Sequence, residues 1–253
     1  MTNFNPITGS RLPPYYLVAL HAALDETAPD TTLVLATGIC SDSTDTIDMY
    51  VESAITIDCA TVGAAGLDTG VLVLNEVYYV HVIGDSSGYR VPSALVSLSI
   101  DDPIMPTGYD SFRMVDFKTT DADADFRSSF TVGAYSERLC VFEDPVTVHD
   151  TTGAAAFTAI TLAALAPALE MVEAQFSATL TPIAANDTLD LRSTGATGSY
   201  ASMSGSVIAV DKTTDITCLA LANALGFPSV DFKTNAAGTA VAVIKLKSIA
   251  FEV

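Results

Sequence analysis

The sequence contains no tryptophan and few basic residues. Its 253 residues include 11 Lys and Arg against 30 Asp and Glu, which gives a net charge of −19. Electrostatic binding to nucleic acids or to anionic membranes depends on clustered Lys and Arg, so we expect neither partner. Intrinsic disorder is excluded as well, because 49% of the residues are hydrophobic and disordered chains combine high charge with low hydrophobicity.

Long apolar runs and targeting signals are also missing. No stretch of 18 or more apolar residues occurs, which predicts no transmembrane helix and no membrane insertion. The first eight residues show neither the basic region nor the apolar segment of a secretory signal. The cysteines are far apart and form no CxxC pair, which predicts buried free thiols rather than a zinc site. They are Cys40, Cys59, Cys140 and Cys218.

Motifs of common enzymes are absent. The sequence has no G-x-S-x-G elbow, no phosphate-binding G-x-x-x-x-G-K-[ST] loop and no strand-linked G-x-G-x-x-G. We expect His21 and His81 to serve in packing and hydrogen bonding. His149 precedes Asp150, but neighbouring side chains on a strand point to opposite faces, which disfavours a catalytic pair. The expectation is a protein that is not an enzyme and has no catalytic residues, cofactor or metal.

The residues that are abundant favour β-structure. Thr, Val, Ile and Ser are common, and short apolar runs alternate with turn residues at a spacing typical of sandwiches and barrels. The expected strands are 32–37, 49–57, 71–74, 77–83, 94–100 and 112–117, then 156–162, 169–180, 188–191, 205–210, 217–221 and 239–253. The Ala-rich segment 154–175 has a helix-like composition, but Pro167 inside a helix would cost about 3 kcal/mol, so we expect two strands and a turn. The predicted fold class is all-β.

Acidic residues gather in two runs. Asp42, Asp45 and Asp48 recur at every third position, and Asp121, Asp123 and Asp125 form a D-x-D-x-D series. Alternating carboxylates resemble the start of an EF-hand calcium loop, which needs Gly at its sixth position and Glu at its twelfth. Counted from Asp121, these positions are Phe126 and Val132. A solvated acidic turn is therefore favoured, and metal binding by Asp121, Asp123 and Asp125 is left open.

One ordered series of motifs goes beyond composition. It begins with G-L-D-T-G at Gly66 and continues with Y-Y-V-H-V-I from Tyr78, D-S-S-G from Asp85, A-L-V-S-L-S from Ala94 and P-T-G-Y ending at Tyr109, with Pro103 before the last motif. This series resembles a recurrent module of tailed-bacteriophage virion structural proteins. The resemblance covers residues 38–126.

Two segments depart from the pattern of that family. The aromatic pair is Tyr78-Tyr79 where Trp-Tyr is usual, and the last strand reads FRMVDF from Phe112 rather than R-R-I-G. The resemblance implies two β-sandwich or jelly-roll-like domains, a virion-type β module at 1–130 and a β-sandwich at 131–253. It also implies a turn in which Gly66 and Gly70 supply a positive φ and Asp68 a side-chain hydrogen bond.

The function that the resemblance implies is structural. Members of this family are fibre, spike, tail-fibre, baseplate or head-decoration components, commonly trimeric and without cofactors. We therefore expect a homotrimer in the virion that contacts other capsid, tail or baseplate proteins. The high apolar content favours burial between protomers, and the acidic surface would keep copies soluble before assembly.

Two other functions stay open. One alternative is a carbohydrate-binding module for a host-surface glycan, with Tyr89 and Tyr109, both beside turns, as the contacting aromatic residues. A remote alternative is a polysaccharide hydrolase whose paired carboxylates lie far apart in the sequence.

Overall fold

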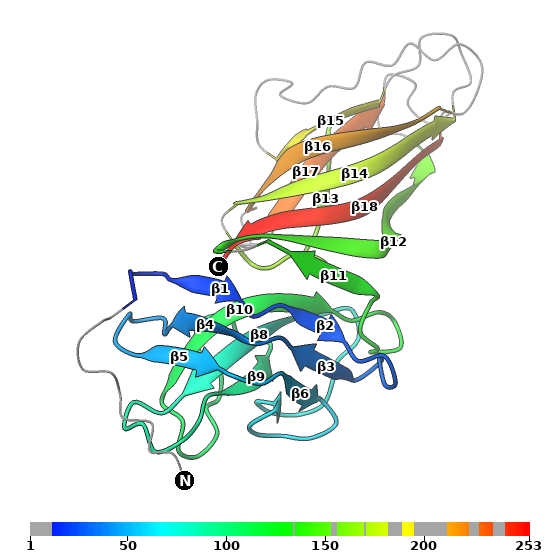
Figure 1. Ribbon diagram of the computed structural model, residues 1–253. Helices are drawn as coiled ribbons and strands as arrows, with labels where there is room; N and C mark the ends of the chain where they lie inside the picture. The colour runs from blue at the N-terminus through cyan, green and yellow to red at the C-terminus, as the bar shows by residue number, and fades with distance from the viewer. Residues whose placement is uncertain are drawn as a thin grey trace. The chain divides into compact units, whose positions relative to one another are not determined.

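The computed structural model describes residues 12–133, 135–152, 156–169, 171–181, 189–194, 212–222, 228–234 and 241–253. Throughout these residues the regular secondary structure is β, with no helix, so the predicted all-β class is confirmed (Figure 1). The described part of the chain accordingly contains no helix that is long and apolar enough to cross a membrane.

The chain divides into two compact units. Unit 1 comprises residues 1–139 together with Glu252–Val253, and unit 2 comprises Cys140–Phe251. The division falls within a 16-residue strand, β12 (Glu137–Thr152). This strand is hydrogen-bonded to β11 (Ser129–Val132) on one side and to β18 (Val241–Glu252) on the other.

Unit 1 is built from three small sheets. One is β1-β4-β5, the second is β2-β3-β6, and the third is the four-stranded sheet β10-β8-β9-β7. Within the third sheet β7 runs parallel to β9, and the other pairs are antiparallel. The strands are β1 (Leu17–Ala19), β2 (Ala22–Leu24), β3 (Thr32–Leu35), β4 (Gly38–Ser41), β5 (Asp48–Val51), β6 (Ile55–Asp58), β7 (Gly66–Leu67), β8 (Val77–Gly84), β9 (Ser93–Ser97) and β10 (Ser111–Thr119).

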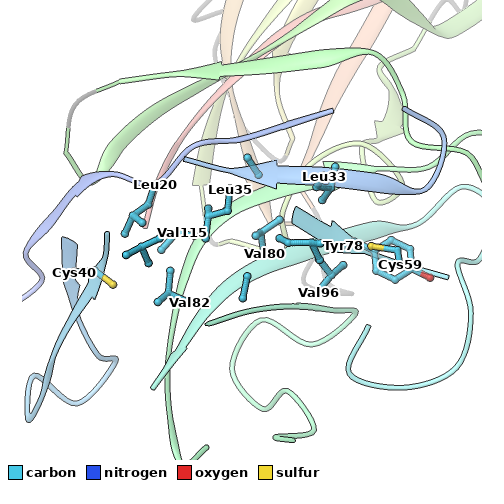
Figure 2. Packing of buried hydrophobic residues seen from close by; sticks show 14 of the residues in the cluster. Leu20, Leu33, Leu35, Cys40, Cys59, Tyr78, Val80, Val82, Val96 and Val115 are labelled. Carbon is cyan, nitrogen blue, oxygen red and sulfur yellow. The ribbon is translucent and has the colours of Figure 1, made fainter. Parts of the chain in front are cut away.

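The core of unit 1 receives side chains from all three sheets. Figure 2 shows Val80 and Val82 of β8 and Val96 of β9 packed with Leu33 and Leu35 of β3. All eight residues of β8 are buried, as expected for a strand with neighbours on both sides and cover on both faces. This central strand fixes the positions of the loops at its two ends.

Unit 2 has the two facing layers of a β-sandwich. The strands β12, β18, β14 (Met171–Thr181) and β16 (Lys212–Ala222) follow one another, and β17 (Pro228–Thr234) pairs with both β13 (Thr158–Thr161) and β15 (Leu189–Ser193). Only two residue pairs join β16 to β17, so the sheet turns there. The rings of His149 in β12 and Phe232 in β17 lie 4.1 Å apart although these strands are not neighbours, which shows that the layers face each other.

Most of the expected strands overlap an observed strand. This holds for 32–37, 77–83, 94–100, 112–117, 156–162, 169–180, 188–191, 217–221 and 239–253. The expected turn in the Ala-rich segment is also confirmed, because the amides of Leu165 and Ala166 both donate to the carbonyl of Leu162. The expected strand at 205–210 lies outside the described residues.

Two expected strands are wrong. The segment 49–57 is not one strand, because β5 pairs with β4 and β6 pairs with β3, so the chain passes from one sheet to another between them. The segment 71–74 forms no strand because side chains satisfy its backbone groups. The Tyr78 hydroxyl accepts from the Val73 amide at 2.8 Å, and the Thr120 hydroxyl donates to the Val73 carbonyl at 2.6 Å.

Candidate interaction surface

The motif series from Gly66 to Tyr109 occupies one sheet and the loops that join its strands. G-L-D-T-G supplies β7, the tyrosine-containing motif supplies β8, D-S-S-G lies in the β8–β9 loop, and P-T-G-Y lies in the β9–β10 connection. The register confirms the adjacency, because Val80 lies opposite Val96 and His81 lies opposite Leu95. Residues far apart in the sequence therefore meet at the two ends of this sheet.

The structure gives Gly66, Asp68 and Gly70 three different roles at one end. Gly70 has the expected positive φ of 72°. Gly66 does not have a positive φ, but a Cβ there would collide with the backbone carbonyl oxygen of Thr61, so close backbone approach requires glycine. The Asp68 carboxylate accepts from the Ser97 hydroxyl at 2.7 Å and from the Ile104 amide at 3.1 Å. Asp68 therefore holds the β9–β10 connection beside β7.

The loop at the other end is organised around the Asp85 carboxylate. Its Oδ1 atom accepts from the Ser87 amide at 2.9 Å and from the Ser87 hydroxyl, and its Oδ2 atom accepts from the Tyr89 and Arg90 amides at 3.1 Å. Gly88 supplies a positive φ of 72°. The hydrogen bonds, above all that from the Ser87 side chain, lower the pKa of Asp85. The loop is thus held by its ionised carboxylate.

A second carboxylate ties this loop to the β9–β10 connection. Asp110 accepts from the Ser86 amide at 2.8 Å and also from the Ser86 hydroxyl, while its own amide donates to the Gly84 carbonyl at 3.0 Å. The hydrogen bond from the Ser86 side chain is the main reason that the pKa of Asp110 is lowered. The two loops therefore form one surface, which we call the tyrosine surface and define as residues 85–92 and 106–110.

Tyr89, Arg90 and Tyr109 are the large side chains of the tyrosine surface. Tyr89 is 91% exposed, and Tyr109 is half-buried. The guanidinium of Arg90 lies 5.5 Å from the centre of the Tyr109 ring, within the range of a cation–π contact. Gly108 makes room for it, because a Cβ at this position would overlap the Arg90 guanidinium. The structure thus brings both sequence-predicted tyrosines to one surface.

Exposed apolar side chains occur in other loops of the same sheet. Val71 is 75% exposed and Ile104 is 60% exposed, and Leu74 and Leu98 are exposed as well. These residues lie in segments that enter or leave β8, β9 and β10. Single exposed apolar residues are common, and the feature that marks a partner-binding surface is a contiguous apolar patch.

The acidic turn holds its own backbone. Asp121 Oδ1 accepts from the amides of Asp123 at 2.9 Å and Asp125 at 3.1 Å. Burial and the neighbouring carboxylates raise the pKa of Asp125. In the described part of the chain, no group of three His, Cys, Asp or Glu side chains has the geometry of a metal site.

His81 and the described cysteine side chains are buried in the fold. His81 is fully buried, its Nε2 atom lies 3.0 Å from the Ser99 carbonyl oxygen, and burial lowers its pKa to about 4. Cys40, Cys59 and Cys140 are buried thiols, and burial raises the pKa of Cys40 and of Cys59 to about 12. These residues are placed for packing, and the side chain of Cys218 lies outside the described residues.

Sequence reasoning missed a buried charged cluster in unit 1. Asp116, Lys118 and Arg138 are each at most 2% exposed, and the Lys118 Nζ atom lies 3.8 Å from Asp116 Oδ2. Thr131 joins the pair by donating to Asp116 at 2.9 Å and accepting from Lys118 at 3.3 Å. The only signal in the sequence was the pair of oppositely charged residues, Asp116 and Lys118, two positions apart in β10.

No family model, curated protein or solved structure matches the chain.

Proposed function

We propose that the protein is a structural component of a tailed-phage particle, a homotrimeric fibre, spike, baseplate or head-decoration protein. The observation that carries the proposal is the ordered motif series from Gly66 to Tyr109. It is supported by the all-β fold and by the placement of the whole series on the single sheet β10-β8-β9-β7. The function of such a protein is to assemble into the particle. The backbone hydrogen bonds between its strands and the packing of its apolar faces make the assembly rigid.

The surface of this sheet supports association between copies. Val71, Leu98 and Ile104 leave apolar area exposed on the isolated chain. The four-stranded sheet ends in β10 on one side and in the two-residue strand β7 on the other. A closed cyclic assembly buries apolar area and covers such edges, which otherwise favour aggregation.

Two measurements test this proposal. Sedimentation equilibrium of the full chain should give a mass of three times 26.4 kDa. Immunogold labelling of phage particles from cells that carry the gene should place the protein on the particle surface. A stable monomer combined with unlabelled particles would refute the proposal.

A second candidate function, glycan binding, is favoured by the tyrosine surface. Tyr89 presents an almost fully exposed ring on a loop whose backbone is fixed by Asp85. Because the loop backbone is already ordered, stacking of the ring on a sugar face would cost little backbone conformational entropy. Many such surfaces on one particle would bind a host glycan with high avidity.

A glycan array tests the second candidate directly. Binding should be lost in Tyr89→Ala and in Tyr109→Ala. It should be retained in Tyr135→Ala, which removes another exposed tyrosine of unit 1 that lies outside the tyrosine surface. The absence of binding at millimolar sugar, or equal loss in all three variants, would eliminate this function without affecting the structural proposal.

A further inference from the structure

The corner between β1 and β2 has a backbone conformation that its own residues do not favour. Ala19 and Leu20 have φ values of 59° and 63°, in the left-handed region that residues with a Cβ rarely adopt. The neighbouring structure must therefore hold this corner. Leu20 is fully buried in the unit 1 core, so the corner also closes one side of that core (Figure 2).

Arg138 is the side chain that holds the corner. Its Nη2 atom donates to the Ala19 carbonyl, and its Nη1 atom donates to the Leu20 carbonyl at 3.3 Å. Nη1 also lies 2.8 Å from Nδ1 of His21. Arg138 is only 2% exposed, so these contacts lie out of water.

The contact with Arg138 fixes the protonation state of His21. A guanidinium offers only donors, so Nδ1 must be an unprotonated acceptor and the imidazole must be neutral with its proton on Nε2. The ring also forms a hydrogen bond with the backbone of Gly133. The two bonds together define one neutral tautomer.

The surroundings already contain more positive than negative charge. The charged groups near the His21 ring are Arg138 on β12 and Asp116 and Lys118 on β10. Asp116 is the single carboxylate among them, and it is engaged by the Ala22 amide at 2.9 Å, by the Thr131 hydroxyl and by Lys118. A proton on His21 would add a third cation beside one carboxylate. Burial first and Arg138 second accordingly lower the pKa of His21, and Asp116 opposes them.

We propose that His21 and Arg138 form an acid-sensitive latch for the β1–β2 corner. At neutral pH the imidazole accepts the Arg138 hydrogen bond, and the corner stays closed. Uptake of one proton at Nδ1 removes that acceptor and places two cations side by side. The β1–β2 corner then separates from Arg138, and Leu20 loses its cover in the unit 1 core. The latch lies wholly within unit 1 and does not depend on the proposed virion function.

Hydrogen–deuterium exchange of the full chain at pH 7.5 and pH 5.0 tests the latch. After correction for intrinsic exchange rates, residues 17–24 should lose protection on acidification, by at most about tenfold per pH unit below 6.5, because one proton is linked to opening. Residues 171–181 in β14, which belong to unit 2 and not to the unit that contains His21 and His81, serve as the internal reference and should change much less.

Two variants separate the effect of His21 from that of His81, which is fully buried. His21→Asn keeps an oxygen acceptor near the position of Nδ1 but does not titrate, so residues 17–24 should stay protected at pH 5.0. His81→Gln should respond like the wild type. Equal protection of the wild type at both pH values, an unchanged response in His21→Asn, or loss of the response in His81→Gln would overturn the proposal.

A direct measurement on the unmodified protein decides the matter if His21→Asn does not fold. Nitrogen-15 NMR of the ring should show the Nε2–H tautomer at pH 7.5 and protonation of Nδ1 as the exchange of residues 17–24 rises. A protonated ring or an Nδ1–H tautomer at pH 7.5 would contradict the latch.

Discussion

At the scale of single residues, the glycines of the G-L-D-T-G motif are required for different reasons. Gly70 has a positive φ but open space around its Cα, whereas Gly66 has an ordinary φ and the carbonyl of Thr61 in the place of a Cβ. A substitution at Gly70 therefore strains one residue. A substitution at Gly66 must move the backbone of a neighbouring segment.

Alanine substitutions should separate these two effects. Gly70→Ala should reduce the free energy of unfolding by about 1–2 kcal/mol, the usual cost of a left-handed conformation for a residue with a Cβ. Gly66→Ala should cost about 3 kcal/mol or more, at the upper end for single substitutions. Urea denaturation of both variants and the wild type gives the order, and a larger loss in Gly70→Ala would contradict the structure.

His81 makes stability depend on pH. Its pKa is about 4 in the folded protein because of burial, against about 6.5 in an unfolded chain. Between these two pH values the unfolded state binds a proton that the folded state excludes. The free energy of unfolding therefore falls as the pH falls from 6.5 to 4, and the contribution of His81 does not change with pH above 6.5. The full loss is about 3 kcal/mol.

The variant His81→Gln isolates this contribution. Thermal melting of the wild type and the variant at intervals between pH 7.5 and 4 should show a smaller decline in the variant. Its absolute stability at pH 7.5 is not the readout, because glutamine packs differently from imidazole. Parallel curves for the two proteins would show that His81 is protonated within the folded state.

At the scale of elements, β14 is the plainest amphipathic strand. Its residues alternate between buried and more exposed positions along the whole strand, with Phe176 fully buried and Glu173 exposed. Phe176→Ala should cost about 3–5 kcal/mol of unfolding free energy through lost burial and a cavity. Glu173→Ala on the opposite face should change it by no more than about 0.5 kcal/mol. Chemical denaturation of both variants tests this assignment of faces.

The alternation that identifies a strand does not identify its partner. Apolar runs and alternation predicted β8, β9, β14 and β18, and in β14 and β18 the alternating apolar positions decide which face is buried. The prediction failed at 71–74, where the pattern is strand-like. There the hydroxyls of Tyr78 and Thr120 form the hydrogen bonds that a neighbouring strand would otherwise provide. Such side-chain hydrogen bonds join residues up to 47 positions apart, so no local sequence pattern reveals them.

Other elements were missed because their sequences are irregular. In β12, Arg138, Cys140 and Phe142 alternate inward, but Glu143, Asp144 and Pro145 follow and hide the strand in a polar stretch. The strands β4 and β17 contain Gly or Pro at their starts, which are residues that usually mark turns. The fold class was therefore predictable from composition, whereas the sheet order was not.

The candidate sites show the same limit. The turn chemistry of Asp85 and Gly88 could be predicted, since Asp and Gly have known local roles in loops. The placement of Tyr89 and Tyr109 on one surface depends on the hydrogen bond between Ser86 and Asp110, which are 24 positions apart. The latch of His21 and Arg138 joins residues 117 positions apart, and only the folded chain brings them together.

At the scale of the whole molecule, the net charge and the exposed apolar residues act in opposite directions. Each copy carries a net charge of −19, so like charges oppose the approach of a second copy. Val71, Leu98 and Ile104 offer apolar area whose burial favours association. The proposed trimer must therefore be held by apolar contacts against electrostatic repulsion.

Salt should strengthen such an assembly. The Debye length falls from about 30 Å at 0.01 M to about 8 Å at 0.15 M, which screens repulsion between acidic protomers and leaves apolar burial intact. Sedimentation equilibrium at both salt concentrations should then show a lower dissociation constant at 0.15 M. Val71→Ser should weaken association at both salt concentrations, since it removes exposed apolar area without changing charge. Weaker association at higher salt would mean that opposite charges hold the copies together, which would contradict an assembly built on apolar faces.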